Sequence, residues 1–239
     1  MLKLLKFAKP YGLMLSLAIA LLFAQANFDL TLPDYLSRIV NTGIQQSGVE
    51  DAVPQAIRQG EMNRVVLFMS AADKESVLAD YTLVDKNSAD YETYVEEYPV
   101  LEKESIYVLK DIDQTEMNRI NPIMAKALLA VSGIEQVLAD PAKSAQMGSA
   151  FGNFDLSKLP PGVDVFTVLG QLPAEQLAKI SATMDEKFAA LGDNMIVQAS
   201  VSAVKAEYKA LGMNTDKLQN SYILNVGGWM LLLTLASGV

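Results

Sequence analysis

The chain has 239 residues, enough for one or two domains, and its 19 basic and 28 acidic side chains give a formal net charge of −9. It contains no cysteine and no histidine, which excludes disulfides, the usual zinc, haem and iron–sulfur ligand sets and any catalytic triad that needs histidine. The mean hydropathy of +0.19 is high for a chain with 20% charged residues, because apolar residues are concentrated at the two ends.

The first apolar run follows a short basic start that holds Lys3, Lys6 and Lys9. Residues 12–24 include only one polar side chain, Ser16, and apolar residues at helical spacing continue to Val40. We expect one helix from Pro10 to about Ile44, which would be roughly 50 Å long at 1.5 Å per residue. That length exceeds a bilayer core, so the helix would tilt or project, and Pro33 is predicted to kink it.

A cleaved signal peptide is the alternative interpretation of this start. The lysines, an apolar core of 13 residues and the sequence Ala24-Gln25-Ala26 fit a cleavage site, and a mature N-terminus at Asn27 would support it. The apolar pattern does not stop there, however, and a secreted soluble domain gives no reason for a second apolar run. A membrane helix with a cytoplasmic N-terminus is therefore favoured.

Asp29 is the one acidic residue that falls within the outer part of this predicted span. Ionisable residues inside a membrane are candidates for a substrate path by default. A position in a water-filled cavity or at the interface is the alternative, and both interpretations stay open.

The middle segment, residues 45–221, carries 15 basic and 26 acidic side chains, so no affinity for nucleic acid is expected. Start and stop signals predict a mostly helical domain. The predicted helices run from Ser70 to about Asp80, from Asn121-Pro122 to Asp140, from Pro173 to Gly192 and from Asp193 or Asn194 to Gly212. A strand over 105–110 is expected to pair with 81–84, and 147–163 reads as a loop.

No motif in the middle segment predicts chemistry. No phosphate-binding loop is present, and the sequence around Asp111 and Asp113 lacks the other oxygen ligands and the glycine of a calcium loop. Tyr91, Tyr94 and Tyr98 lie among acidic residues, where a half-packed, solvated segment is favoured over a ligand-binding surface. The sequence therefore predicts no catalytic, cofactor-binding or metal-binding residue, and a free-standing enzyme is the least expected class.

The last apolar run, residues 222–239, would span ~27 Å as a helix, nearly a bilayer. Tyr222 and Trp229 suit the membrane interface, and Gly227-Gly228 would let another helix approach closely. The run lacks the basic residues that should follow it, so we expect a longer protein. A buried C-terminal helix or strand is the alternative.

Two phrases resemble the start of bacterial ABC exporter half-transporters of the multidrug type, in which a membrane domain precedes an ATP-binding domain. The first is residues 5–11, ending in Lys9-Pro10-Tyr11, and the second is residues 32–44, LPDYLSRIVNTGI. The resemblance covers about 44 residues. Most members have a brief loop between the first two membrane helices, whereas this chain has about 177 residues there, and some heterodimeric members carry such an insertion.

The resemblance implies a mainly α chain: a cytoplasmic elbow and first transmembrane helix (1–44), an extracellular insertion (45–221) and the start of a second transmembrane helix (222–239). It implies a multi-pass protein of the cell membrane whose partners are the lipid bilayer, a second half-transporter subunit and a small-molecule or peptide substrate. ATP and Mg would bind in a domain that this chain does not contain.

Two other functions remain open from the sequence. A sensor would have the same topology, with an external ligand domain between two helices and a cytoplasmic signalling module. A secreted or surface binding protein would need cleavage after Ala26. The long first helix and its closing phrase over 39–44 favour the exporter.

Overall fold

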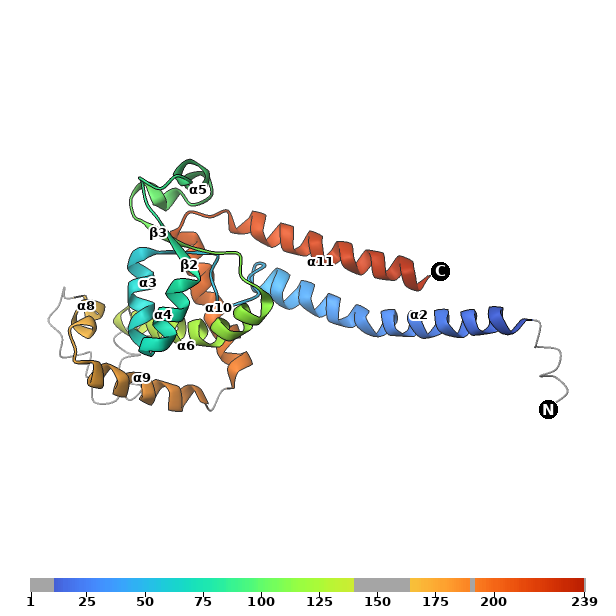
Figure 1. The fold of residues 1–239 in the computed structure, drawn as a ribbon, viewed down its shortest axis with the longest axis horizontal. Coiled ribbons are helices and arrows are strands. Elements are labelled where there is room, and N and C mark those ends of the chain that lie inside the picture. The colour runs from blue at the N-terminus through green and yellow to red at the C-terminus, as the bar shows by residue number, and fades with distance from the viewer. Residues whose placement is uncertain (1–10, 140–163, 190–191, 239) are drawn as a thin grey trace. The chain divides into compact units, whose positions relative to one another are not determined.

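The computed structural model describes residues 11–139, 164–189 and 192–238 (Figure 1). This part of the chain is mainly helical, as predicted, and it includes three short strands. The chain divides into two compact units, which we call unit 1 (residues 1–48 with 216–239) and unit 2 (residues 49–215). The boundaries at 48/49 and 215/216 lie a few residues inside the predicted ones at 44/45 and 221/222.

The described residues of unit 1 form two long helices. Helix α2 (Gly12–Arg38) continues without a break into the π-helical turn η2 (Ile39–Gln45), as the apolar periodicity predicted. Pro33 lies inside α2, and the helix runs on through it. Helix α11 (Thr215–Ser237) begins seven residues before the predicted start at Tyr222, because the polar residues ahead of the apolar run are helical too.

The two helices of unit 1 touch at Gly43. A Cβ atom built on Gly43 would lie 2.8 Å from Ile223 Cγ1 and 3.5 Å from Tyr222 Cδ1, so no side chain fits here without displacing α11 residues. Gly43 is buried by this contact. Glycine thus permits the close approach of η2 and α11.

Unit 2 contains the remaining elements. Its helices are α3 (Gln59–Val65), η3 (Val66–Phe68), α4 (Ala71–Ala79), α5 (Tyr91–Glu97), η4 (Pro99–Glu102), α6 (Gln114–Ala139), α8 (Val165–Gly170), α9 (Ala174–Ala189) and α10 (Asp193–Ala210). Its strands are β1 (Ala56–Arg58), β2 (Tyr81–Val84) and β3 (Ile106–Leu109), and they form one antiparallel sheet in the order β1-β3-β2.

The predicted pairing of β2 with β3 is confirmed, with Tyr81 opposite Leu109 and Val84 opposite Ile106. The third strand, β1, was not predicted. It has only three residues, too few to show an alternating pattern, and it pairs with the other edge of β3.

Helix α6 forms the centre of the unit 2 core. One of its faces is fully buried and consists of Ile120, Met124, Leu128, Val131, Ile134 and Val137. This face packs mainly against α10, which buries Ile196, Val204 and Tyr208. Burying one such aliphatic side chain contributes about 1.5–3 kcal/mol, so the α6–α10 contact is a principal source of stability for unit 2.

The predicted helix start at Asn121-Pro122 is wrong, because α6 begins seven residues earlier, at Gln114. Asp113 marks the true start, and its Oδ1 accepts a hydrogen bond from the Glu116 N–H at 2.8 Å. The Asn121 side chain instead holds another segment: its Oδ1 accepts from the Ala52 N–H, and its Nδ2 donates to Asp51 Oδ1, both at 2.8 Å.

Other predicted helix ends are confirmed. Ser70 caps α4 by accepting a hydrogen bond from the Asp73 N–H at 3.1 Å. Gly212 follows α10 with a φ of +81°, and the next N–H, that of Met213, donates to the Tyr208 carbonyl at 3.0 Å. Helix α10 begins at Asp193 as predicted, directly after Gly192, whose φ is +77°. The predicted end of the preceding helix at Gly192 stays a prediction, because residues 190–191 lie outside the described residues. The predicted loop over 147–163 lies outside the described residues.

Candidate functional site

Helix α2 has no buried residue. Its exposed apolar side chains run along its whole length and include Leu13, Met14, Leu15, Leu17, Ile19, Leu21, Leu22, Phe23, Leu30 and Leu36. An exposed apolar surface of this size is unfavourable in water and marks a membrane or protein contact.

Two helices in the described part of the chain are long and apolar enough to cross a membrane, Gly12–Gln45 and α6. Half of the apolar stretch of α6 is buried inside unit 2, where it serves as the core helix, so burial already accounts for its composition. Helix α11 does not meet the same test, although it exposes Leu224, Trp229, Leu231, Leu232 and Leu235. The second span predicted over 222–239 therefore stays a prediction.

The outer half of α2 carries a polar stripe, which we define as Asn27, Thr31, Asp34 and Arg38. All four side chains are exposed, and their spacing of four, three and four residues places them on one face of the helix. Asn27 Nδ2 donates to the Phe23 carbonyl at 2.7 Å, and Thr31 Oγ1 donates to the Phe28 carbonyl at 2.8 Å. These bonds lower the cost of placing the two polar groups on an apolar helix.

Asp29 does not belong to the polar stripe. At about 100° per residue it lies roughly 160° around the helix from Asn27 and Thr31, on the side that carries Leu22 and Leu36. It is exposed there. Asp29 remains a candidate for the substrate path on sequence grounds, and helix geometry places it on another face than the polar stripe, near the exposed Gln25 one turn earlier.

Unit 2 has one described groove of note, with a volume of ≈ 810 Å³. Its apolar lining comes from η3 and Met69, the first half of α6 and one face of α9: Val66, Leu67, Phe68, Met69, Pro122, Ile123 and Leu177. Two acidic and two basic residues stand at its rim, and one pair of them, Lys126 and Asp185, approaches to 3.9 Å. The acidic and basic residues balance, so the groove does not favour cationic over anionic ligands.

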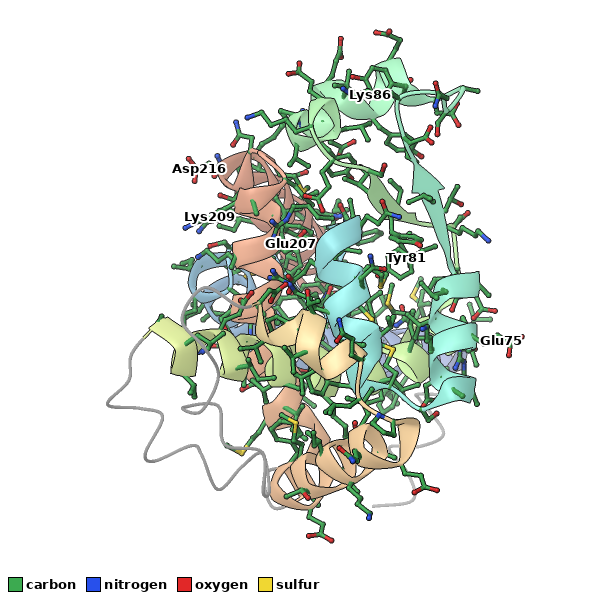
Figure 2. All side chains as sticks on the ribbon, turned by 90° about the vertical axis from the view of Figure 1, so that its left-hand side faces the viewer. Glu75, Tyr81, Lys86, Glu207, Lys209 and Asp216 are labelled. Atoms are coloured by element: carbon green, nitrogen blue, oxygen red, sulfur yellow. The ribbon has the colours of Figure 1, made fainter. Side chains whose placement is uncertain are left out.

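A partly buried ion pair joins β1 to α10. Arg58 Nε lies 3.0 Å from Glu207 Oε1 and Arg58 Nη2 lies 2.7 Å from Glu207 Oε2, a bidentate arrangement. The Arg58 backbone N–H donates to the same carboxylate at 2.7 Å. Figure 2 shows Glu207 and Tyr81 inside unit 2, whereas Glu75 and Lys86 point outward.

Glu61 on α3 lies near this ion pair, but its own carboxylate makes a longer ion-pair contact than Glu207 does. Within the described residues it pairs with Arg64 at 3.5 Å, and Arg64 also contacts Glu135 at 3.0 Å and Asp164 at 4.0 Å. Burial raises the pKa of Glu61 to about 7, and the nearby Glu135 and Glu207 carboxylates add to the shift against the opposing effect of Arg64 and Arg58.

The tyrosines among acidic residues are partly packed, in line with the favoured interpretation. Tyr98 is buried, and its ring stacks on Tyr94 with centroids 6.2 Å apart. Burial raises the pKa of Tyr98, so its hydroxyl stays neutral. Among the described residues no group of three or more acidic side chains has the geometry of a metal site.

No family model, no curated protein and no solved structure matches the chain.

Proposed function

We propose that the chain is part of the membrane subunit of an ABC exporter, in which α2 crosses the bilayer and unit 2 is an extracellular domain. The observation that carries this proposal is the Gly12–Gln45 helix, which is long and apolar enough to span a membrane and exposes its apolar side chains. The resemblance of residues 5–11 and 32–44 to exporter subunits supports the more specific assignment.

Charge distribution supports the orientation. The three lysines at 3, 6 and 9 precede the apolar run without an acidic residue, whereas residues 45–221 carry a net charge of −11. Basic residues next to a span stay on the cytoplasmic side, so the N-terminus would be cytoplasmic and unit 2 would lie outside.

Helix α11 would return the chain across the membrane. The contact of Gly43 with Ile223 brings α11 against the end of the first span, and the leucines from 224 to 235 then offer an apolar surface to lipid or to further helices. ATP binding and hydrolysis, which drive alternating access in exporters, would take place in a cytoplasmic domain that also holds Mg. A second half-transporter subunit would complete the path.

The polar stripe on α2 supports a role in lining a path. Polar side chains inside a membrane face water-filled cavities or other helices and avoid lipid. Asn27, Thr31, Asp34 and Arg38 would therefore face the interior of the exporter, where a small-molecule or peptide substrate passes. Asp29, on another face of α2, would face a second water-filled part of the path or a neighbouring helix.

Membrane topology is the first test of this proposal. Because the chain has no cysteine, single cysteines are clean reporters. In intact cells a membrane-impermeant maleimide should label Lys86→Cys, which is exposed in unit 2, and should not label Lys3→Cys until the membrane is opened. Labelling of Lys86→Cys only after permeabilisation, release of the chain by alkaline carbonate, or a mature N-terminus at Asn27 would each overturn it.

The reading frame of the source gene tests the exporter assignment separately from the topology. Further apolar helices followed by a G-x-x-x-x-G-K-[ST] phosphate loop would support it. A coiled-coil or kinase module after the second helix would identify a sensor instead, and a stop codon directly after Val239 would contradict the exporter.

A further inference from the structure

We infer that Glu61 is a proton-binding site inside a charge cluster that ties the beginning of unit 2 to its end, so that the stability of this tie depends on pH. The inference rests on contacts within unit 2 alone and is independent of the proposed function.

The tie consists of hydrogen bonds between the first residues of unit 2 and α10, the last helix of that unit. Arg58 is held by Glu207 through its side chain and its backbone N–H, and the Gln55 N–H donates to the Tyr208 hydroxyl at 2.9 Å. The Tyr81 hydroxyl donates to the Pro54 carbonyl at 2.8 Å from the opposite side. The short segment 54–58 is thus fixed by two elements, α10 and β2.

The cluster around this tie contains more carboxylates than guanidinium groups. Arg58 and Arg64 are the two cations, and the anions come from five places: Glu61 on α3, Glu104 before β3, Glu135 on α6, Asp164 before α8 and Glu207 on α10. Glu207 occupies Arg58 in a bidentate pair, and Glu104 accepts a hydrogen bond from the Gly60 N–H at 2.8 Å.

Glu61 is the carboxylate whose charge is least compensated. It shares Arg64 with Glu135, which is closer to that guanidinium, and with Asp164, which is half exposed and can be solvated by water. The Glu61 side chain is only 10% exposed, so water solvates its carboxylate much less than it solvates the half-exposed Asp164. An ionised Glu61 would also repel the buried Glu207, whose pairing with Arg58 makes the tie.

The direction of the pH effect follows from the raised pKa of Glu61, about 7 against an ordinary value of 4.5. The folded state binds the proton more tightly than the unfolded chain does. The stabilisation is therefore complete below about pH 4.5 and is lost as the pH rises through about 7. From this group alone, the folding equilibrium constant of unit 2 should fall roughly 30-fold between about pH 5.5 and pH 8.

The test compares the full-length protein in detergent with two variants, Glu61→Gln and Glu75→Gln. Glutamine imitates the neutral carboxyl, so Glu61→Gln should lose this pH dependence of thermal unfolding and should be more stable than the parent protein at pH 8. Glu75 is exposed on α4, so Glu75→Gln should keep the parent pH profile. A Glu61→Gln protein with the parent profile, or one that fails to fold, would overturn the inference.

A direct titration completes the experiment. With ¹³C-labelled glutamate, the carboxyl resonance that is absent from Glu61→Gln should titrate with a midpoint about two pH units above the exposed glutamates. A midpoint near the ordinary value would show that Glu61 is ionised at neutral pH and would contradict the proton-binding role.

Discussion

The guanidinium of Arg58 on β1 lies 2.7 Å from the carboxylate of Glu207 on α10, although 149 residues separate them in the sequence. The Glu207 side chain is 4% exposed and the Arg58 side chain 30% exposed, so the pair is closed to water mainly on its acidic side. The two residues thereby connect the first strand of unit 2 to its last helix.

Replacing Glu207 by alanine should strongly destabilise unit 2. The change leaves the Arg58 side chain and its backbone N–H without their acceptor, and breaking a partly buried pair in this way costs about 3 kcal/mol. Chemical denaturation of the protein gives the free energy of unfolding. Glu92→Ala, an exposed change on α5, is the control and should alter that free energy by less than about 0.5 kcal/mol. Equal effects of the two changes would mean that the pair contributes nothing.

Gly212 is required where α10 ends. Its φ is +81°, and an added Cβ would lie 3.1 Å from Pro99 Cδ, so alanine meets both backbone strain and a crowded neighbour. We expect Gly212→Ala to cost about 1–2 kcal/mol in the free energy of unfolding. Gly170→Ala is the matched control, because its Cβ would only touch Leu67 Cδ2 at 3.7 Å. A cost as large for Gly170→Ala would show that loss of glycine, and not the left-handed conformation, is responsible.

Unit 2 should fold without the helices of unit 1. Its core, centred on α6 and α10, is internal to residues 49–215, and the Arg58–Glu207 pair holds its two ends together. Residues 49–215 expressed alone should give a soluble protein with a single cooperative unfolding transition and a helical circular dichroism spectrum. An aggregated or unfolded product would mean that unit 2 depends on unit 1.

The polar stripe should be accessible to water in the membrane. Thiol labelling with a membrane-impermeant reagent compares Thr31→Cys, on the stripe, with Leu36→Cys and Asp29→Cys, which lie on the opposite side of α2. We expect Thr31→Cys to react severalfold faster than the other two. Equal rates at the three positions would show that no face of α2 is turned to water, and fastest labelling at Asp29→Cys would place the path on the opposite side.

Local signals predicted much of the fold. The β2–β3 pairing, the Ser70 cap and the Gly212 helix end each depend on a few adjacent residues. Asn121-Pro122 misled because Asn before Pro is a common helix start, whereas here the Asn121 side chain binds Ala52 and Asp51 far away in sequence. The role of Asn121 is therefore set by tertiary contacts, which the local sequence does not reveal.

The charge cluster could not be predicted, since its members come from four elements and two connecting segments between residues 58 and 207. Glu61 and Glu207 resemble ordinary surface residues of amphipathic helices in the sequence, and only packing brings them together. The exposed apolar face of α2 was predictable, because it depends on composition and periodicity within a single helix.

The approach of η2 to α11 predicts a specific cross-link. A Cβ on Gly43 would lie 2.8 Å from Ile223 Cγ1, one bond from the Ile223 Cβ, which puts the two Cβ atoms within the roughly 3.5–4.5 Å that a disulfide needs. Oxidation of Gly43→Cys/Ile223→Cys should therefore give an intramolecular disulfide, seen as a mobility shift that a reductant reverses. The chain has no other cysteine to compete.

Gly43→Cys/Leu224→Cys is the matched control for this cross-link. Leu224 is the next residue on α11 and is 75% exposed, so its side chain leaves the helix in another direction. We expect little or no disulfide in this pair under the same oxidation. Equal cross-linking of the two pairs would show that α11 rotates or slides against η2, and a failure of the first pair alone would contradict the close contact at Gly43.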